Sequence, residues 1–370
     1  MSTPPAGVLP VALPAPRHAD PRDAPVLRWG ILAPGWIASM FTGALLAHTG
    51  QQVVAVGSRD LARATAFAER FAIPRAHGSY EDLVADPAVD VVYVASPHSE
   101  HRAQALLAIA AGKHVLVEKA FTRNAAEARE VVAAARAAGV LVMEAMWTRY
   151  LPHTDVLRQL LDDGALGEVR LVTADFGTRA EPDPTHRLLD PALAGGALLD
   201  LGIYPLAFAS FVAAHAGLGR QPVNVQVAGS RASTGVDEQA AIQLGYAGGA
   251  QAQLFTTLLA PTARTAHVLG TDARLEVGAD FFLPTSVRLV VDDQHVEWSD
   301  NRIRGHDGLC FQAAALARYV AAGLTESPLQ PLAETVAILE TADEVRRQLG
   351  VAFPGEGAGP DDGLDPADLG

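Results

Sequence analysis

The sequence contains a single cysteine, Cys310, among 370 residues. One cysteine excludes an internal disulfide bond and any metal cluster built from several thiolates. It also fits a reducing compartment, so we expect a cytoplasmic protein. Positive charge is scarce as well: 28 Lys and Arg residues stand against 42 Asp and Glu residues, giving a formal net charge of −14 at pH 7. This balance argues against nucleic acid or an anionic membrane as a partner.

Long apolar runs are also missing. No stretch approaches the roughly 18 uninterrupted apolar residues of a membrane-spanning helix, and the N-terminus lacks a basic segment leading into an apolar one. Its proline- and alanine-rich start, "MSTPPAGVLPVALPAPRHADPRDAP", predicts a disordered leader over residues 1–25. The composition of "PGEGAGPDDGLDPADLG" predicts a disordered acidic tail over residues 353–370.

Short apolar runs alternate with helical stretches between residues 27 and 143. The runs are "LRWGIL", "QVVAVGS", "VDVVYVAS", "KHVLVEK" and "VLVME". Runs that are apolar on both faces and separated by helices indicate a parallel sheet covered on both sides. With right-handed crossovers, this pattern predicts an α/β Rossmann domain, a doubly wound parallel sheet, over residues 26–148.

The pattern changes after Tyr150. Two helical stretches, "HTDVLRQLLDDG" and "GALLDLGIYPLAFASFVAAHAG", accompany a series of alternating strands, and two further helices are expected over residues 307–322 and 332–349. Strands in series with helices segregated around them predict an α+β domain over residues 149–352, built on a large, mostly antiparallel open sheet. If the free face of that sheet is apolar, we expect a partner to cover it.

The first turn, "LRWGILAPGWIASMF", has the strand–turn–helix form that binds a dinucleotide pyrophosphate. The usual G-x-G-x-x-G fingerprint here has Ala33 at its first position, which is unfavourable because alanine disfavours positive φ. Gly35 keeps the second position, where the backbone must approach the phosphates. We therefore expect Ala33, Gly35, Trp36 and Ile37 to contact a cofactor, with an ordinary strand–turn–helix as the alternative.

The end of the second strand indicates which cofactor. NAD-binding proteins usually carry an acidic residue there for the ribose 2′-hydroxyl, whereas this chain has Ser58 and Arg59, with Arg63 one helical turn later. A 2′-phosphate would find donors and positive charge at this place. The sequence therefore predicts NADP, with NAD still possible, unless the arginines are merely surface residues beside a helix N-cap.

The next two strands end in polar residues. Because ligands of doubly wound sheets lie at the carboxyl ends of the strands, we expect these residues to cluster beside the cofactor: Ser96, Pro97, His98, His101, Glu118 and Lys119. Lys119 in a cleft is suited to polarise or protonate a carbonyl, although a solvated lysine after a strand is the plainer interpretation. No third ligand is spaced to join the two histidines, so we expect no metal.

Asp200 and Tyr204 are four residues apart in an apolar helical stretch and so share one helix face. A buried carboxylate requires a partner, and Lys119 across the cleft is a candidate. Beside a lysine, Tyr204 would have a lowered pKa and become a candidate proton donor and acceptor. Otherwise it is an ordinary core tyrosine.

Five motifs in this order, "WGILAPGWIA", "SPHSEH", "HVLVEKA", "MEAMWTRYLP" and "GGALLDLGIYP", resemble the glucose–fructose oxidoreductase/inositol dehydrogenase (Gfo/Idh/MocA) family. Within it, the chain is most similar to dimeric trans-1,2-dihydrodiol dehydrogenases and NADP-dependent D-xylose 1-dehydrogenases. The resemblance implies hydride transfer between nicotinamide and a secondary alcohol or hemiacetal carbon of a sugar, polyol or cyclic trans-diol. It also implies a homodimer or a dimer-based oligomer.

The resemblance further implies that Lys119 is the lysine of the family's E-K-P motif and that Asp200 and Tyr204 complete the proton-transfer site. Two departures are visible: Ala120 replaces the usual proline and His98 the usual asparagine. The residues that fall on the substrate side of relatives are Trp147, Arg149, Arg170 and Phe176.

Two other functions remain open at this point. One is an NAD-dependent, redox-neutral glycosidase of the same family, which Ser58 and Arg59 disfavour. The other is a non-catalytic NADP sensor or scaffold, since a fold does not fix a function. The joint presence of Lys119, Asp200 and Tyr204 disfavours the second alternative.

Overall fold

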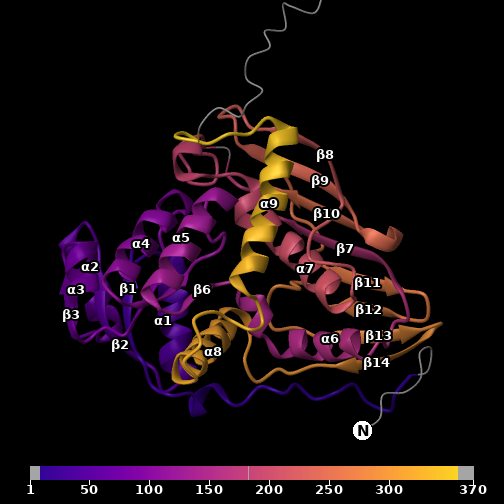
Figure 1. The fold of residues 1–370 in the computed structure, drawn as a ribbon, viewed down its shortest axis with the longest axis horizontal. Helices are drawn as coiled ribbons and strands as arrows, with labels where there is room; N and C mark the ends of the chain where they lie inside the picture. Colours follow the sequence, from indigo (N-terminus) through magenta and orange to yellow (C-terminus); the bar gives the residue numbers. More distant parts are fainter. Residues whose placement is uncertain (1–8, 182, 357–370) are drawn as a thin grey trace, which may run out of the picture.

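A computed structural model of the chain describes residues 9–181 and 183–356. Figure 1 shows two lobes, each built around one sheet; the N-terminal segment runs beneath the second lobe to the first, and the chain crosses back to the second after β6. The first sheet has the strand order β3-β2-β1-β4-β5-β6, and all its pairings are parallel. The predicted Rossmann domain is thereby confirmed.

The strands of this first sheet are short and mostly buried, as the apolar runs predicted. They are β1 (Arg28–Leu32), β2 (Gln52–Gly57), β3 (Arg75–His77), β4 (Val91–Val94), β5 (His114–Val117) and β6 (Val142–Glu144). The helices between them are α1 (Trp36–His48), α2 (Leu61–Phe71), α3 (Tyr80–Ala85), α4 (His101–Ala110) and α5 (Ala125–Ala138). The chain order reverses between β1 and β4, which is where sheets of this kind bind ligands.

The second sheet is mixed. Its strand order is β14-β13-β12-β11-β7-β10-β9-β8, and among these pairs only β7 and β10 run parallel. The strands are β7 (Val169–Gly177), β8 (Asn224–Arg231), β9 (Asp237–Gly245), β10 (Gln251–Thr257), β11 (Ala266–Gly270), β12 (Arg274–Val277), β13 (Val287–Val291) and β14 (Gln294–Trp298). The predicted α+β domain with a large, mostly antiparallel sheet is confirmed.

Helices cover one face of the second sheet. These are α6 (Pro152–Asp162), the π-helical turn η5 (Leu198–Gly202), α7 (Ile203–His215) and α9 (Leu332–Leu349). By length and composition, the helical stretch Pro191–His215 would suffice to cross a membrane, but 89 % of its most apolar window is buried inside the protein. It therefore has the character of a core helix.

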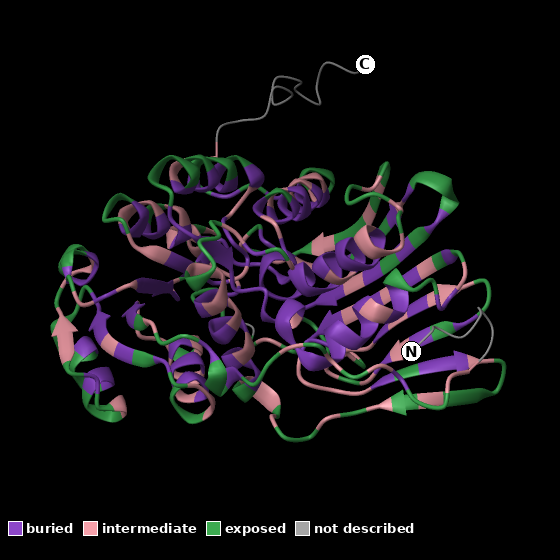
Figure 2. Cartoon of the chain, turned by 60° about the horizontal axis from the view of Figure 1, so that its bottom comes forward, coloured by how far each residue is buried: buried purple, intermediate pink, exposed green. Residues whose placement is uncertain are grey.

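The other face of the second sheet carries a row of mainly polar side chains, so it is not the apolar face that would require a covering partner. Buried and exposed residues alternate along the strands (Figure 2). The side chains of this row occupy paired positions on neighbouring strands, from β8 to β14: Gln226, Gln243, Gln253, Thr173, His267, Glu276, Arg288 and Glu297. Any partner on this face must satisfy hydrogen bonds as well as bury apolar surface.

The expected disorder of residues 1–25 is wrong for the part that the structure describes, residues 9–25. This segment runs along the bottom edge of the molecule in Figure 1, beneath α6 and α8 (Leu309–Ala321). Leu13 is buried, the Arg17 guanidinium lies 2.8 Å from Asp155 of α6, and the His18 ring packs edge-on against Phe311 of α8. Proline richness signalled an extended segment, and specific side chains fix it in place. Residues 1–8 lie outside the described residues.

The C-terminal segment returns to the first lobe. α8 packs against α1, and α9 packs against both α5 and α7. The Thr325 carbonyl accepts a hydrogen bond from Val142 N at the edge of β6. At the start of the expected disordered tail, Phe353 is buried and the carboxylate of Glu356 lies 2.8 Å from Arg346. The remainder of that tail, residues 357–370, lies outside the described residues.

Candidate functional site

The predicted phosphate-binding turn closes one end of a cavity of about 380 Å³ at the carboxyl ends of β1, β2 and β4. Ala33 adopts a φ of 68°, and Gly35 is the N-cap of α1, whose first turn has no side-chain cap. A Cβ built on Gly35 meets no atom within 4 Å. Ser96 also lines the cavity, and its buried Oγ has no hydrogen-bond partner among the described residues. Free helix N–H groups and an unpaired hydroxyl fit a pyrophosphate.

The arginines predicted to select the cofactor line the same cavity. Arg59 and Arg63 are exposed beside the buried Ser58, and neither forms an ion pair within the described part of the chain. Asp60 is the acidic neighbour, and its carboxylate accepts a hydrogen bond from Ala62 N to cap α2. The structure thus groups the predicted 2′-phosphate residues with the turn.

The two histidines have different surroundings. The ring nitrogens of His101 lie 2.8 Å from the carbonyl oxygens of Ser96 and Ala120, so His101 ties the end of β4 to the segment after β5. His98 lies 3.1 Å from the Ala194 carbonyl, and burial, followed by the charge of His101, lowers its pKa to about 3. His98 is therefore neutral at neutral pH, and burial also lowers the pKa of His101. Among the described residues, no group of three His, Cys, Asp or Glu side chains is arranged to hold a metal.

Glu118 holds the backbone of Lys119. Its carboxylate accepts one hydrogen bond from the Lys119 amide and another, at 2.5 Å, from the hydroxyl of Tyr93. Burial raises the pKa of Glu118. The peptide bond between Lys119 and Ala120, the position where the family has proline, is cis.

Lys119 reaches across from the first lobe to η5. Its ammonium donates to the Asp200 carbonyl oxygen at 2.7 Å and lies 3.6 Å from the Asp200 carboxylate. Arg187 approaches the same carboxylate at 3.1 Å from the loop before η5. Burial alone would raise the pKa of Asp200, but the charges of Lys119 and Arg187 outweigh burial and hold it well below its ordinary value. The predicted pairing of Lys119 with Asp200 is present.

Tyr204 lies against both Lys119 and Trp147. The lysine ammonium is 5.1 Å from the centre of the tyrosine ring, and Trp147 Nε1 donates to the tyrosine hydroxyl at 3.0 Å. Our expectation of a lowered pKa is wrong for the protein without cofactor. Burial, together with the carboxylates of Glu118 and Asp200, raises the pKa of Tyr204 above that of a free phenol. Lys119 faces the ring rather than the hydroxyl, so its charge does little to stabilise a phenolate.

Aromatic rings surround this group. Phe176 stacks on Phe282 with 4.1 Å between centroids, and both rings contact Tyr204. On the other side, His306 lies parallel to Trp147 at 5.7 Å and meets Trp36 edge-on at 5.0 Å. Trp36, which is 65 % exposed, and its neighbour Ile37 open α1, so they lie between the turn and these rings.

Arg149 is not available on the substrate side, contrary to prediction. The side chain is 3 % exposed, and its Nη2 donates to the Glu334 carboxylate at 2.7 Å and to the Ala207 carbonyl at 2.8 Å. These contacts fix the short helix η3 (Trp147–Tyr150) against α7 and α9. Arg149 stands two residues after Trp147 in η3 and points to a different side, because successive residues of a helix face different directions.

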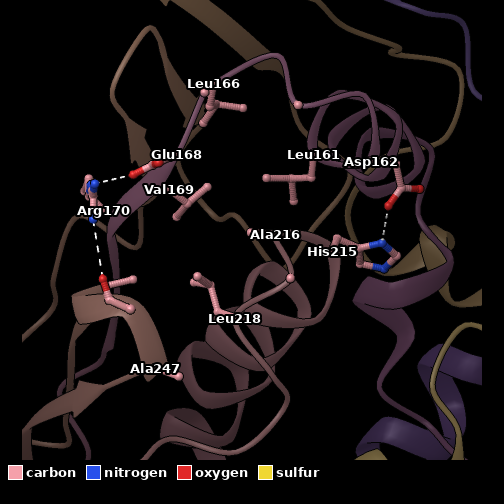
Figure 3. A pocket seen from close by; sticks show the side chains of 15 residues that line it. Leu161, Asp162, Leu166, Glu168, Val169, Arg170, His215, Ala216, Leu218 and Ala247 are labelled. Carbon is pink, nitrogen blue, oxygen red and sulfur yellow. Dashed lines mark hydrogen bonds and ion pairs between the residues drawn. The ribbon is translucent and has the colours of Figure 1, made fainter.

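Arg170 is also far from the group. It stands six residues before Phe176 on β7 and lines a separate cavity with Asp162 and His215, shown in Figure 3. It pairs with Glu168, and its side chain is 53 % exposed. Six residues of strand span roughly 20 Å, which places Arg170 near the opposite end of the sheet from Phe176.

Three residues of this site were missed by the sequence analysis: Arg187, Phe282 and His306. Arg187 lies in an irregular loop, Phe282 in a turn between strands, and His306 in the short helix η7 (Gly305–Gly308). None belongs to a motif or a periodic segment. Only the folded arrangement brings them to the site.

Two family models match the chain. The model described as "Oxidoreductase family, NAD-binding Rossmann fold" matches residues 27–146, and the GFO/IDH/MocA C-terminal domain matches residues 154–276. The chain is 41 % identical to trans-1,2-dihydrobenzene-1,2-diol dehydrogenase from Sus scrofa over 337 residues, which cover 89 % of this chain and 98 % of that protein. It is 40 % identical to the Homo sapiens protein of the same name over 336 residues, with the same coverage.

Solved structures of similar fold support this family assignment. KijD10, a 3-ketoreductase from Actinomadura kijaniata solved with NADP and TDP-benzene, superposes with a TM-score of 0.74 at 29 % identity over 87 % of this chain and 97 % of that one. Aldose-aldose oxidoreductase from Caulobacter crescentus has the same fold, with a TM-score of 0.77 at 24 % identity over 88 % and 97 % of the two chains. The chain therefore belongs to the Gfo/Idh/MocA family of oxidoreductases, whose first domain is an NAD(P)-binding Rossmann fold.

Proposed function

We propose that this oxidoreductase uses NADP to interconvert a secondary alcohol or hemiacetal carbon and the corresponding carbonyl in a sugar, a polyol or a cyclic trans-diol. The observation that carries the proposal is the meeting of Lys119, Asp200 and Tyr204 at the lobe boundary, beside the predicted cofactor cavity. The relatives named as dihydrodiol dehydrogenases and the ketoreductase KijD10 support this substrate range.

The cofactor proposal rests on the cavity around the first turn. The N-terminus of α1 and Ser96 would hold the pyrophosphate, while Ser58, Arg59 and Arg63 would hold the 2′-phosphate. Bound there, NADP supplies the hydride donor or acceptor of the reaction. Charge-assisted hydrogen bonds from two guanidiniums favour a dianionic phosphate over a ribose hydroxyl.

We assign the transfer of a proton to and from the substrate oxygen to Tyr204. Its raised pKa keeps the hydroxyl protonated at neutral pH, so in the reductive direction it donates this proton to the carbonyl oxygen. Lys119, held by Asp200 and by the amide contact with Glu118, supplies the positive charge that stabilises the developing alkoxide. In the oxidative direction the step starts from deprotonated Tyr204, which takes the proton of the alcohol, so the raised pKa disfavours this direction at neutral pH.

Aromatic walls favour a substrate with an apolar or ring-shaped face. Phe176, Phe282 and Trp147 surround the tyrosine hydroxyl with rings. Both the carbon face of a pyranose and a cyclohexadiene ring pack well on such surfaces. Arg187, which is 55 % exposed beside Asp200, is placed to contact a second hydroxyl.

Turnover measured with aldoses, polyols and cyclic trans-diols, each with NADP and NAD, tests the proposal. Lys119→Met should abolish turnover of any active pair. The matched control is Lys113→Met, because within the described residues Lys113 donates hydrogen bonds to the main-chain carbonyl oxygens of Asp86 and Val89 in the first lobe and to no side chain. Equal losses in the two variants, or turnover faster with NAD, would contradict the proposal.

A homodimer through the outer face of the second sheet is proposed as the functional assembly. This face bears a groove of about 600 Å³ lined by residues of β7, β8, β9 and β10, among them Gln226, Gln243 and Gln253. Glutamines can pair with each other across a two-fold axis. Light scattering should give a dimer at micromolar concentration, and Gln253→Glu should weaken it by placing like charges together. A monomeric wild type would overturn the assignment.

A cytoplasmic location is proposed from the unpaired, buried Cys310, which fits a reducing compartment. Fractionation of cells that express the full chain with a C-terminal epitope tests it. Recovery of the protein in an extracellular or membrane fraction would contradict the proposal.

A further inference from the structure

A second cavity, of about 460 Å³, lies apart from the predicted cofactor cavity. It is lined by residues of the N-terminal segment, η3, α6 and α8, together with Leu329. Its volume falls in the range of small-molecule sites. The segment that closes it, around Arg17 and His18, precedes residue 27, where the family match begins. The cavity is thus a feature of this chain that the family match does not account for.

Arginines dominate the lining of the cavity. Arg17, Arg149, Arg158 and Arg318 contribute guanidiniums, and Asp155 is the one carboxylate among the described lining residues. This concentration of positive charge stands out in a chain with a net charge of −14.

The available carboxylates do not balance these arginines. Asp155 is shared, at 2.8 Å from Arg17 and 2.7 Å from Arg158. Arg318 donates to the main-chain carbonyl of Asp20 and forms no ion pair within the described residues. Because Glu334 already neutralises Arg149, the excess of positive charge lies between Arg158 and Arg318.

Two of the guanidiniums are buried with bonding capacity to spare. Arg149 is 3 % exposed and Arg158 is 6 % exposed, and the Nε of each has no hydrogen-bond partner among the described residues. A buried guanidinium without full pairing is costly, and a bound anion would relieve that cost.

The rest of the lining is apolar and aromatic. Tyr150, Phe311 and Tyr319 contribute rings, and Leu151 and Leu329 contribute aliphatic surface. Rings of this kind accept a flat apolar body by stacking or edge contact. Asp162 and Asp163 attract Arg17 electrostatically and so offset part of the positive charge of the cavity. A ligand with a single negative charge would balance the remainder.

We propose that this cavity binds a small aromatic monoanion, with a carboxylate against Arg158 and Arg318 and a ring against the aromatic lining. Arg guanidiniums match a carboxylate in a two-point geometry. The segment around Arg17 and His18 then serves as a wall of the site rather than as a leader.

The test uses the full chain without cofactor and 4-fluorobenzoate as probe, followed by fluorine NMR line broadening. We expect 4-fluorobenzoate to bind and the uncharged 4-fluorobenzamide not to bind. Arg318→Gln and Arg17→Gln, which change side chains at the rim, should each weaken binding about tenfold or more. Arg129→Gln is the matched control, because Arg129 pairs with Glu340 and neither residue lines this cavity, so the change should leave binding unchanged.

A second control excludes the proposed active site, where an aromatic acid also has rings to pack on. Lys119→Met should bind 4-fluorobenzoate as the wild type does. If binding is lost in Lys119→Met and kept in Arg318→Gln, or if the benzamide binds equally well, the proposal is overturned. None of these outcomes depends on the turnover of a substrate. Failure of the binding proposal can therefore be distinguished from failure of the oxidoreductase proposal.

Discussion

Replacing Tyr204 with phenylalanine removes one hydroxyl and keeps the ring that packs on Phe176 and Phe282. The hydroxyl accepts a hydrogen bond from Trp147 Nε1 at 3.0 Å, and both residues are buried. The variant leaves this indole N–H without a partner, which costs about 1–3 kcal/mol of unfolding free energy. The structure therefore predicts a measurable loss of stability.

Activity should fall further than stability. Loss of a general acid reduces kcat by roughly 10²–10⁴-fold, or about 3–5 kcal/mol in the activation barrier. NADP affinity should survive, because Tyr204 does not line the cofactor cavity. Urea unfolding, steady-state kinetics and cofactor titration on the same preparation separate the three effects.

Tyr150→Phe is the matched control for Tyr204→Phe. Tyr150 is also buried and donates its hydroxyl to Ser327 at 2.8 Å, away from Lys119. Both variants should lose stability, and only Tyr204→Phe should lose kcat. In the double variant with Lys119→Met, the effects of the two substitutions on kcat should be far from additive if the two residues act as one unit. A Tyr204→Phe enzyme within twofold of wild-type kcat would refute the assignment of the proton to this residue.

Three further predictions concern other parts of the chain. Arg59→Ala should weaken NADP binding about tenfold or more in a fluorescence titration and leave NAD binding unchanged, since only the 2′-phosphate loses a contact. Ala33→Gly should raise the free energy of unfolding by about 0.5–1 kcal/mol, because alanine is strained at a φ of 68°; unchanged urea denaturation would contradict this. Glu334→Gln should lower the free energy of unfolding by about 3–5 kcal/mol, because it leaves the buried Arg149 without its charged partner. A loss below about 1 kcal/mol would contradict this prediction.

Much of the fold follows from periodicity. The five apolar runs of the first domain correspond to strands, and helix α9 coincides with the predicted residues 332–349. The strands β3 and β12 and the helix α3 were missed, because their sequences, "RAH", "RLEV" and "YEDLVA", lack the continuous apolar run that marks the equally short β4 and β5. The disordered leader was wrong for a related reason: composition reports the absence of a repeating apolar face, whereas Leu13 and Arg17 are held by single, non-periodic contacts.

The site was predictable where its residues end strands or share a helix face. Lys119, Asp200 and Tyr204 could be grouped because strand ends meet at one sheet edge and residues four apart face one side. Arg149 could not be placed correctly, since its orientation depends on Glu334, a partner distant in sequence. Arg170 was misplaced because six residues of β7 separate it from Phe176. The pKa of Tyr204 likewise depends on burial and on carboxylates distant in sequence.

The return of the C-terminal helices to the first lobe bears on how the chain folds during synthesis. The edge of β6 and the surface of α1 are covered by residues beyond 305, among them Thr325 and those of α8. While the ribosome is still making this last portion, the Rossmann sheet has an unpaired strand edge and an apolar helix face open to other chains. Contacts at such large sequence separation form late and slow folding. Production of this protein at low temperature or with chaperones should therefore increase its soluble yield, more so than for a chain whose first domain is completed by its own residues.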